Sequence, residues 1–288
     1  MSVCVKIKGG LGNQLFQYAL GKKISKDLGA PLLLDTSYYS QKSFNGNDPR
    51  EFELGGFDLK ANKAKSSDLP ILAKIPFADR LLKRLPKLSF TGMLYEEHTQ
   101  GNIDPKKTPI YLDGYWQTLS HIEEVEDELR KDLVLKNIPD TYKPILKEIR
   151  SSNSVSIHVR RGDYITNSKN KNLFGECDRE YYQRAIEKLQ DETKELRFFV
   201  FSDDIKWAEE NLDLPKNTEY VDKISPNIPA VSMYLMSQCK NHIIANSTFS
   251  WWGAWLSNSP SKKVIAPKNW YINGWSSKEM MPKGWILL

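Results

Sequence analysis

The sequence predicts an α/β protein made of two units, and three observations indicate this class. A chain of 288 residues, of which 40% are hydrophobic, is long enough to bury two cores. Short strand-like runs alternate along it with stretches of helical spacing, which is typical of parallel sheets covered by helices. The alternation is clear at both ends of the chain but is interrupted by an irregular, polar stretch at residues 38–100.

The first unit begins with a strand, a glycine turn, a helix and a second strand. Residues 3–8 alternate as a strand, Gly9, Gly10 and Gly12 form the turn, and residues 13–28 follow as an amphipathic helix that Gly29 can end. An apolar strand at 31–34 completes a βαβ unit, which implies parallel pairing. Residues 110–116 then predict a strand that leads into a turn, and residues 122–133 a charged helix.

The second unit starts after residues 137–152, where we place the boundary. Its predicted strands are residues 154–159, 197–201, 242–245 and 263–266. A helix follows the first strand, because apolar residues recur at helical spacing from Tyr182 to Leu189 and Asp178 can cap its start. Shorter helices are predicted up to Leu212, at 228–239 and at 250–256.

Charge and cysteine content narrow the class of protein. Lys plus Arg (41) exceed Asp plus Glu (36) by 5, and this mild excess favours an anionic small-molecule ligand over a nucleic-acid surface. Cys4, Cys177 and Cys239 lie far apart, which predicts neither a disulfide framework nor a zinc site. The sequence shows no signal-peptide pattern and no bilayer-length apolar run, so we expect a cytoplasmic protein.

Polar residues collect directly after three strands of the second unit. These clusters are residues 160–163, 202–204 and 246–249. Because the carboxyl ends of parallel strands share one edge of a sheet, where ligands bind in open α/β folds, we expect the clusters to converge.

The chemistry of the three clusters favours a nucleoside diphosphate. Arg160 and Arg161 offer forked donors for phosphate oxygens, and Ser247 and Thr248 stand where a helix N-terminus attracts an anion. Asp203 or Asp204 can accept hydrogen bonds from a ribose or a base. Each cluster alone also has a plainer interpretation, as solvated arginines or as helix caps.

The glycine turn leaves a second hypothesis open. A turn containing Gly10 and Gly12 after a strand, with Asp35 ending the next strand, is similar to a dinucleotide-binding fingerprint. Leu15 and Phe16 occupy the region of the missing third glycine. An NAD(P)-dependent enzyme of the Rossmann type is therefore the weaker alternative.

Four motifs together carry a resemblance to a known family. They are GGLGNQLFQYA at 9–19, HVRRGDY at 158–164, FSDD at 201–204 and NSTFSWW at 246–252, and they resemble the α-1,2-fucosyltransferases of glycosyltransferase family 11, bacterial members above all. The resemblance spans nearly the whole chain. It implies a GT-B-type fold, in which two Rossmann-like domains face a cleft. It also implies inverting transfer of L-fucose from GDP-fucose to the 2-hydroxyl of a terminal galactoside in an oligosaccharide.

The resemblance also implies roles for individual residues. Arg160 would hold the β-phosphate, while His158 and Asp203 would contact the nucleoside. The diphosphate would lie against Ser247, Thr248 and the Phe249 backbone. The remaining donor-site candidates are Gly10, Gly12, Arg161, Ser202 and Asn246, and Asn13 would lie near the reacting centre.

Two mechanistic points follow from the residue types. The chain has no Asp-x-Asp, so we expect Arg160 and helix N–H groups, instead of a metal, to stabilise the departing phosphate, with no cofactor required. Asp163 is the first candidate for the general base, although a salt bridge that orients Arg160 is an equal interpretation and Asn13 can orient the acceptor instead.

The predicted domains are an acceptor-side domain at residues 1–140, a donor-binding domain at 150–270 and a tail at 271–288. Trp270 and Trp275 are candidates for contact with the acceptor sugar. The basic, leucine-bearing segment 74–88 predicts at most weak contact with a membrane surface, which would suit a lipid-linked acceptor and a peripheral location. A carbohydrate-binding protein without turnover remains an alternative, and no nucleic-acid partner is expected.

Overall fold

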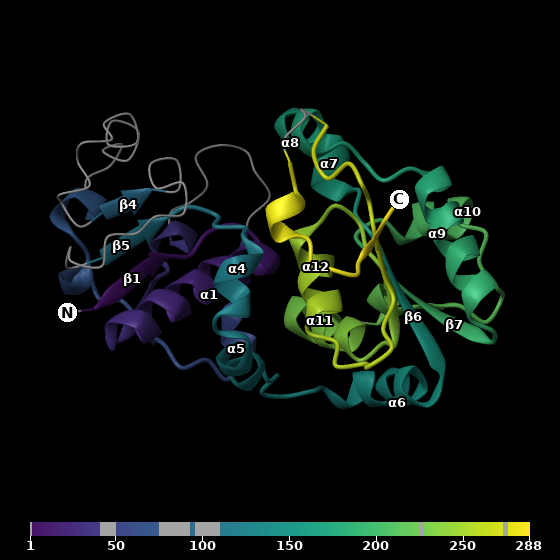
Figure 1. Cartoon of the computed structure of the whole chain (residues 1–288), viewed down its shortest axis with the longest axis horizontal. Helices are drawn as coiled ribbons and strands as arrows, with labels where there is room; N and C mark the ends of the chain where they lie inside the picture. Colours follow the sequence, from purple (N-terminus) through teal and green to yellow (C-terminus); the bar gives the residue numbers. More distant parts are fainter. Residues whose placement is uncertain (1, 41–49, 75–92, 96–109, 225–226, 273–275) are drawn as a thin grey trace. The chain divides into compact units, whose positions relative to one another are not determined.

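The computed structural model describes residues 2–40, 50–74, 93–95, 110–224, 227–272 and 276–288, and the chain divides into two units, Met1–Val134 and Leu135–Leu288 (Figure 1). The division falls before the expected boundary at 140–150. Helix α6 (Lys143–Ser151) explains the difference, because its apolar residues pack in the core of the second unit. Residues 271–288 do not form a separate tail, since a strand near the C-terminus joins the second sheet.

Within the described residues, the first unit contains a five-stranded sheet in the order β3-β2-β1-β5-β4, and every pair of neighbours is parallel. Its strands are β1 (Val3–Lys6), β2 (Leu32–Asp35), β3 (Asn62–Lys63), β4 (Met93–Tyr95) and β5 (Ile110–Asp113). The predicted βαβ unit is confirmed, because α1 (Leu11–Leu28) connects β1 to its parallel neighbour β2. Gly29 ends α1 at φ +58°, the left-handed conformation that favours glycine.

The charged helix predicted at 122–133 is two helices, α4 (Leu119–Glu123) and α5 (Glu126–Asp132). Val125 interrupts them at φ −131°, outside the helical region, and its side chain is buried. Burial of this β-branched residue therefore outweighs the helical pattern of its charged neighbours.

Within the described residues, the second unit contains a six-stranded sheet in the order β11-β10-β9-β6-β7-β8, again parallel throughout. Its strands are β6 (Asn153–Val159), β7 (Leu196–Ser202), β8 (Glu219–Tyr220), β9 (Asn241–Ile243), β10 (Val264–Ala266) and β11 (Ile286–Leu287). Its helices besides α6 are α7 (Gly162–Thr166), α8 (Ser168–Phe174), α9 (Arg179–Glu192), α10 (Ile205–Asn211), α11 (Pro229–Ser237) and α12 (Thr248–Trp255).

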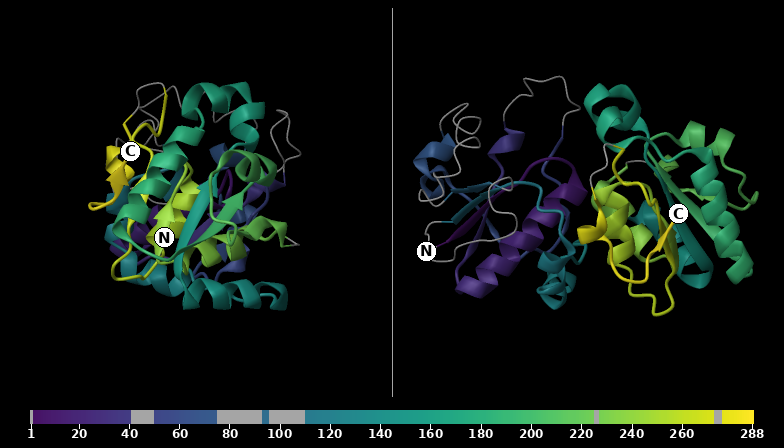
Figure 2. Two further views of the ribbon diagram at one scale, coloured as in Figure 1. Left: turned by 90° about the vertical axis from the view of Figure 1, so that its right-hand side faces the viewer. Right: turned by 45° about the horizontal axis from the view of Figure 1, so that its top comes forward.

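Helices cover both faces of the second sheet, with α9 and α10 on one face and α6 and α11 on the other (Figures 1 and 2). Strand β7 shows why, because successive side chains of a strand point to opposite faces. Phe198 and Val200 pack with α9 and α10, whereas Phe199 and Phe201 pack with α6 and α11. The apolar run of β7, residues 198–201, is therefore buried on both sides, as is typical of parallel sheets.

Short 3-10 turns complete the described structure: η1 (Ser37–Tyr39), η2 (Leu54–Gly56), η3 (Ser66–Asp68), η4 (Ile71–Lys74), η6 (Asp140–Tyr142), η7 (Val221–Lys223) and η8 (Lys278–Met280). In the part of the chain that the structure describes, no helix has both the length and the apolar character needed to cross a membrane. Of the basic segment 74–88, only Lys74 is described, so the predicted membrane contact lies outside the described residues.

Candidate functional site

The second sheet has a switch point beside its central strand, β6. The chain proceeds from β6 outward through β7 to β8 and then returns to the other side of β6 with β9. Open α/β sheets bind ligands at the carboxyl ends of strands beside such a point. The three predicted polar clusters begin at the ends of β6 and β7 and three residues after the end of β9, so the topology brings them to this one edge. We call the edge formed by residues 158–163, 202–204 and 246–249 the donor edge.

An ion pair between Arg160 and Asp203 joins the first two clusters. Arg160 Nη1 lies 2.7 Å from Asp203 Oδ2, and Asp203 Oδ1 accepts a hydrogen bond of 2.8 Å from the Arg161 backbone N–H. Gly162 permits this approach, because a Cβ at that position would lie 2.8 Å from Asp203 Oδ2. Both charged side chains are largely but not fully covered, at 20% and 27% exposure. The guanidinium of Arg160 is therefore held at the donor edge by a carboxylate from the neighbouring strand.

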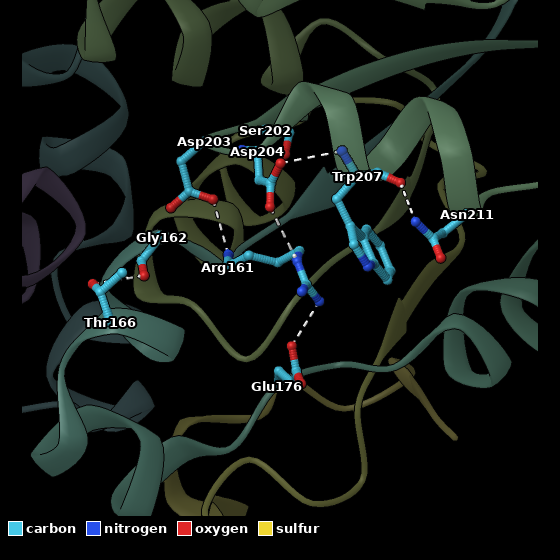
Figure 3. A network of polar contacts seen from close by, with 9 residues as sticks. All are labelled: Arg161, Gly162, Thr166, Glu176, Ser202, Asp203, Asp204, Trp207 and Asn211. Carbon is cyan, nitrogen blue, oxygen red and sulfur yellow. Dashed lines mark hydrogen bonds and ion pairs between the residues drawn. The ribbon is translucent and has the colours of Figure 1, made fainter.

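Arg161 has different surroundings, in which its guanidinium contacts three side chains of the same unit (Figure 3). Its Nη1 lies 2.6 Å from Glu176 Oε2, its Nε lies 3.3 Å from Asp204 Oδ2, and its centre stands 4.2 Å from the ring of Trp207. Glu176 precedes α9, whereas Asp204 and Trp207 belong to the start of α10. The side chain predicted to bind the donor thus ties α9 and α10 to the end of β6.

The residues after β7 form a tight polar turn. Ser202 Oγ accepts a hydrogen bond of 2.9 Å from the Asp204 N–H, and Asp204 Oδ1 accepts one of 3.1 Å from the N–H of Trp207. Asp204 is therefore the N-cap of α10, the plainer role that a Ser-Asp-Asp sequence predicts. Asp203, between them, points its carboxylate at the arginine cluster instead.

His158 is a buried, neutral imidazole near the end of β6. Its exposed fraction is 6%, its ring centre lies 5.5 Å from that of Phe249, and among the described residues its Nδ1 has no hydrogen-bond partner. Burial, and then the charge of Arg160, lower the pKa of His158 to about 3. The ring can therefore offer a neutral hydrogen-bonding group to a nucleoside but not a cation to phosphate.

The cluster after β9 divides into a structural residue and a helix start. Asn246 is buried and donates hydrogen bonds of 2.8 and 3.2 Å from Nδ2 to the carbonyls of Phe174 and Trp270, so it ties loops together. Helix α12 begins at Thr248, two residues earlier than predicted. Ser247 is its N-cap residue, and its side chain makes no capping hydrogen bond. A helix N-terminus with hydroxyl side chains therefore stands at the donor edge, as an anion site requires.

In the first unit, the glycine turn and Asn13 are shaped by close contact. Gly9 has φ +77°, a conformation that favours glycine, and a Cβ there would lie 2.9 Å from Asn13 Nδ2, so a larger residue would displace the Asn13 side chain. Asn13 Oδ1 accepts a hydrogen bond of 2.9 Å from Gln117 Nε2 in the loop after β5. A Cβ at Gly10 would lie 3.6 Å from Arg50 Nη1, an ordinary contact distance, and Gly12 lies buried in α1.

Two fully buried glutamines hold the backbone around this turn. Gln14 donates from Nε2 to the carbonyls of Gly9 and Glu51 and accepts at Oε1 from the N–H groups of Glu53 and Leu54. Gln17 Oε1 accepts from the Lys8 N–H, and its Nε2 donates to the carbonyls of Lys8 and Gly114. Asp113, at the end of β5, lies 3.0 Å from Lys6 Nζ and 2.6 Å from Lys8 Nζ. The loops after β1 and β5 are thus linked by polar groups that the sequence analysis did not single out.

The remaining predicted residues differ in outcome. Asp163 lies in α7, but its side chain is outside the described part of the structure, as is Trp275. Trp270 is only 1% exposed, so its predicted contact with an acceptor sugar is wrong. Trp251 and Trp252 are fully buried and pack against each other with ring centres 5.2 Å apart, so they belong to the core.

The described residues contain no cluster of metal ligands, and their cysteines are buried. There, no group of three or more His, Cys, Asp or Glu side chains is placed to hold a metal ion. The three cysteines are free and buried, and burial raises the pKa of the Cys4 thiol to about 12.

Several residues that build the site were missed from the sequence. Gln14 and Gln17 had a recognisable signal, because polar side chains three positions apart on an otherwise apolar helix face must find buried partners. Glu176, Trp207 and Asp222 carry no such signal, because each contacts a residue that lies 15 or more positions away in the sequence.

Comparison with known proteins adds a family match. Residues 74–288 match the family described as glycosyl transferase family 11. The chain is 35% identical to an alpha-1,2-colitosyltransferase of Escherichia coli, over 99% of both chains. It is also 35% identical to the O-antigen biosynthesis glycosyltransferase WbnK of Escherichia coli, over 98% of this chain and 99% of that protein. Galactoside alpha-(1,2)-fucosyltransferase 1 of Mus musculus is 33% identical over 51% of this chain and 42% of its own length.

The fold is similar to that of solved fucosyltransferases. Fucosyltransferase NodZ from Bradyrhizobium matches with a TM-score of 0.54 and 16% identity, covering 88% of this chain and 93% of that one. NodZ soaked with GDP-fucose matches with a TM-score of 0.51 and 15% identity, over 88% and 92%. The chain contains two Rossmann-like units, each built on a parallel sheet. Together with the likeness to these structures, this confirms the predicted GT-B-type α/β fold class.

Proposed function

Because the chain belongs to glycosyltransferase family 11, we propose that it transfers L-fucose from GDP-fucose, with inversion, to the 2-hydroxyl of a terminal galactoside in an oligosaccharide. The observation that carries the proposal is the donor edge, where a carboxylate-held arginine and a helix N-terminus meet at the switch point of a parallel sheet. Both features suit a diphosphate.

The chemical demand of the reaction explains the arrangement. Cleavage of the bond between the sugar and the phosphate leaves negative charge on the departing nucleotide, and preorganised donors stabilise such charge without reorganisation. Arg160 supplies a planar cation, and its ion pair with Asp203 fixes the orientation of that cation before substrate arrives. The first turn of α12 supplies backbone N–H groups and a favourable dipole. These fixed groups would perform the task that a divalent metal performs in other transferases, so we propose that no metal is required.

The acceptor hydroxyl also has to be activated and oriented, and two residues are candidates for these roles. Inversion requires that the attacking hydroxyl lose its proton, and Asp163 remains the first candidate for the base because α7 starts at the donor edge. Asn13, fixed by Gln117, is the candidate for orienting the acceptor. We propose a galactose-terminated oligosaccharide, free or lipid-linked, as the acceptor. The relatives whose names refer to a galactoside and to O-antigen biosynthesis support an acceptor of this class.

Transfer of colitose is the second candidate, because the alpha-1,2-colitosyltransferase is 35% identical over 99% of this chain. Colitose is fucose without its 3-hydroxyl, so the two donors differ at one polar group. A site that hydrogen-bonds a hydroxyl rejects the analogue lacking it by about 10⁴-fold or more, whereas an apolar pocket discriminates far less. Relative kcat/KM for the two donors therefore identifies the sugar.

The test is a transfer assay with the full chain, GDP-L-fucose or GDP-L-colitose, and a panel of galactose-terminated oligosaccharides. The linkage and the anomeric configuration of the product are determined by NMR, and Arg160→Ala is the control. We expect an α-1,2-linked product from GDP-fucose. Turnover with neither donor on any galactoside, or tight binding of a nicotinamide dinucleotide in place of GDP, would refute the proposal and favour the carbohydrate-binding or the NAD(P) alternative.

A further inference from the structure

Asp222 is a partly covered carboxylate that directly supports the donor edge, although it lies outside all three motif clusters. It belongs to η7, the turn that follows the edge strand β8. Strand β8 pairs with β7 at Phe199 with Glu219 and at Val200 with Tyr220. Continued by two residues, this register brings Asp222 beside Ser202, at the carboxyl end of the sheet.

The contacts of Asp222 agree with this placement. Its Oδ2 accepts a hydrogen bond of 2.7 Å from the backbone N–H of Ser202, and its Oδ1 accepts one of 3.1 Å from the hydroxyl of Ser232 in α11. β8 ends before this point, so the Asp222 side chain takes the place of a backbone acceptor for the last residue of β7. The carboxylate therefore joins the end of β7 to η7 and to a buried helix.

From Ser202, the connection continues to the arginine at the donor edge. Ser202 Oγ fixes Asp204, the N-cap of α10, and Asp203 between them binds both Arg160 and the backbone of Arg161. Asp222 itself is in contact with neither arginine in the described hydrogen bonds and ion pairs. Its effect on them must pass through the backbone of the turn.

We propose that Asp222 is a positioning residue for the donor edge, whose carboxylate holds the end of β7 in the conformation that lets Asp203 orient Arg160. The inference rests on the proposed function for the role of Arg160, and it adds a residue that makes no contact with the donor. The surroundings of Asp222 disfavour its charged form: burial, and then the nearby charge of Asp203, raise its pKa to about 6. An acid kept in an unfavourable environment is expected where its hydrogen bonds serve the arrangement of other groups.

Two substitutions at Asp222 separate positioning from direct contact. Asp222→Asn keeps an oxygen for the Ser202 N–H and an amide that can donate to the Ser232 hydroxyl, whereas Asp222→Ala removes both bonds. Glu219→Ala is the matched control, because Glu219 also bridges to β7 but through Arg197, near the amino end of that strand, at 2.9 Å. All variants are compared at equal folded concentration, which circular dichroism and thermal unfolding establish.

We expect Asp222→Ala to lower kcat/KM for the nucleotide-sugar donor by about 10²-fold, the size of loss that a small misplacement of a catalytic group produces. KM for the acceptor should stay near the wild-type value. Asp222→Asn should recover most of the activity, and Glu219→Ala should retain it. Equal and severe losses of kcat/KM in the Asn and Ala variants would show that the charge of Asp222 itself contacts the ligand. Normal kinetics in a folded Ala variant would show that Asp222 has no positioning role. Either result overturns the proposal.

A second measurement needs no ligand and separates this proposal from the proposed function. Amide hydrogen exchange of the free full-length chain is compared by mass spectrometry for wild type, Asp222→Ala and Glu219→Ala. We expect faster exchange in the Asp222→Ala variant in peptides that cover 158–163 and 200–206, because the Arg161 N–H depends on Asp203. Unchanged exchange there would overturn the positioning role whatever the donor is. Faster exchange in a protein that transfers neither fucose nor colitose would instead leave positioning intact and refute the proposed function.

Discussion

Arg160 and Arg161 are neighbours in the sequence, but they have different electrostatic partners. Arg160 pairs with Asp203 and stands 5.5 Å from the ring of Tyr164, whereas Arg161 pairs with Glu176 and Asp204 and stands 4.2 Å from the ring of Trp207. Because Glu176 precedes α9 and Asp204 caps α10, the guanidinium of Arg161 contributes to the packing of these two helices. We therefore expect the two arginines to affect different measurements.

Arg160→Lys should lower kcat by about 10² to 10³, the usual cost of one transition-state donor, because an ammonium cannot reproduce a planar fork. Arg161→Lys should instead lower the midpoint of thermal unfolding, with a much smaller effect on kcat of the folded enzyme. Steady-state kinetics and thermal unfolding of both variants test this pair of outcomes. Full activity of Arg160→Lys would contradict the assignment of Arg160 to the donor site.

Buried imidazoles should make the protein less stable in mild acid. Burial lowers the pKa of His158 and that of His242 to about 3, far below the ordinary value of 6.5. Between these two pKa values the unfolded chain binds more protons than the folded one. The contribution of the two neutral imidazoles to the free energy of unfolding is therefore fully present above pH 6.5 and decreases as the pH falls toward 3. Asp222 acts in the opposite sense, because its raised pKa lets the folded state bind a proton between about pH 6 and 4.

The measurement is urea unfolding of the wild type, His242→Gln and Asp222→Asn between pH 7 and 4.5. We expect the free energy of unfolding to fall with pH in the wild type. The fall should be shallower for His242→Gln, which removes one buried imidazole, and steeper for Asp222→Asn, which removes the opposing group. A wild-type stability that rises in acid would contradict this prediction.

The part of the site that could be predicted at the residue scale is the part encoded locally. Arg160, Asp203 and Ser247 directly follow predicted strands, so their common edge follows from parallel topology alone. The partners of Arg161 could not be predicted, because Glu176 and Trp207 approach it from separate elements. Trp270 was misjudged because a looped sequence gave no sign of its burial.

Aspartate side chains cap the N-termini of both α9 and α10. Asp178 Oδ1 accepts a hydrogen bond of 2.8 Å from the Tyr181 N–H and caps α9, as predicted. Asp204 caps α10 in the same way but also pairs with Arg161. The two residues allow a comparison between a carboxylate that only caps a helix and one that also pairs with Arg161 at the donor edge.

Asp178→Ala should cost about 1 kcal/mol of stability, the typical value of an N-cap, and leave kcat/KM unchanged. Asp204→Ala should cost at least as much and should also reduce kcat/KM for the donor, because the turn that holds Asp203 is released. Chemical unfolding and donor kinetics of both variants provide the test. An equal effect of the two substitutions on kcat/KM for the donor would show that Asp204 acts only as a helix cap.

The order of elements could be predicted because strand and helix periodicities alternate along the chain. Boundaries were less accurate where tertiary burial decides, as at Val125, which interrupts a charged helix, and at Thr248, where α12 starts early. The irregular stretch 38–100 could not be assigned. Among its described residues, the strands β3 and β4 are only two and three residues long, too short to show a period.

On the scale of the whole molecule, each unit is a parallel sheet with its own core and its own switch point. The second sheet follows the order of a doubly wound fold, with ligand chemistry gathered beside β6 and β9. The division between the units could not be predicted to the residue, because α6 has the polar surface of a linker but an apolar side that packs under β7.

Transfer should continue when divalent metal ions are removed. Arg160 and the N-terminus of α12 already place positive charge at the donor edge, so added cations are not needed to stabilise the departing phosphate. Initial rates are compared in excess EDTA and after addition of magnesium or manganese. A complete loss that metal restores would mean that Asp203 or Asp204 binds a cation.

The most direct test of the account is a crystal structure of the full chain with bound GDP. We predict that the diphosphate lies at the carboxyl edge of the second sheet, within hydrogen-bonding distance of Arg160 and of the first N–H groups of α12, with the guanosine near His158 and Asp203. A nucleotide bound at the glycine turn of the first unit, with Arg160 still distant from any phosphate, would contradict the assignment of the donor edge.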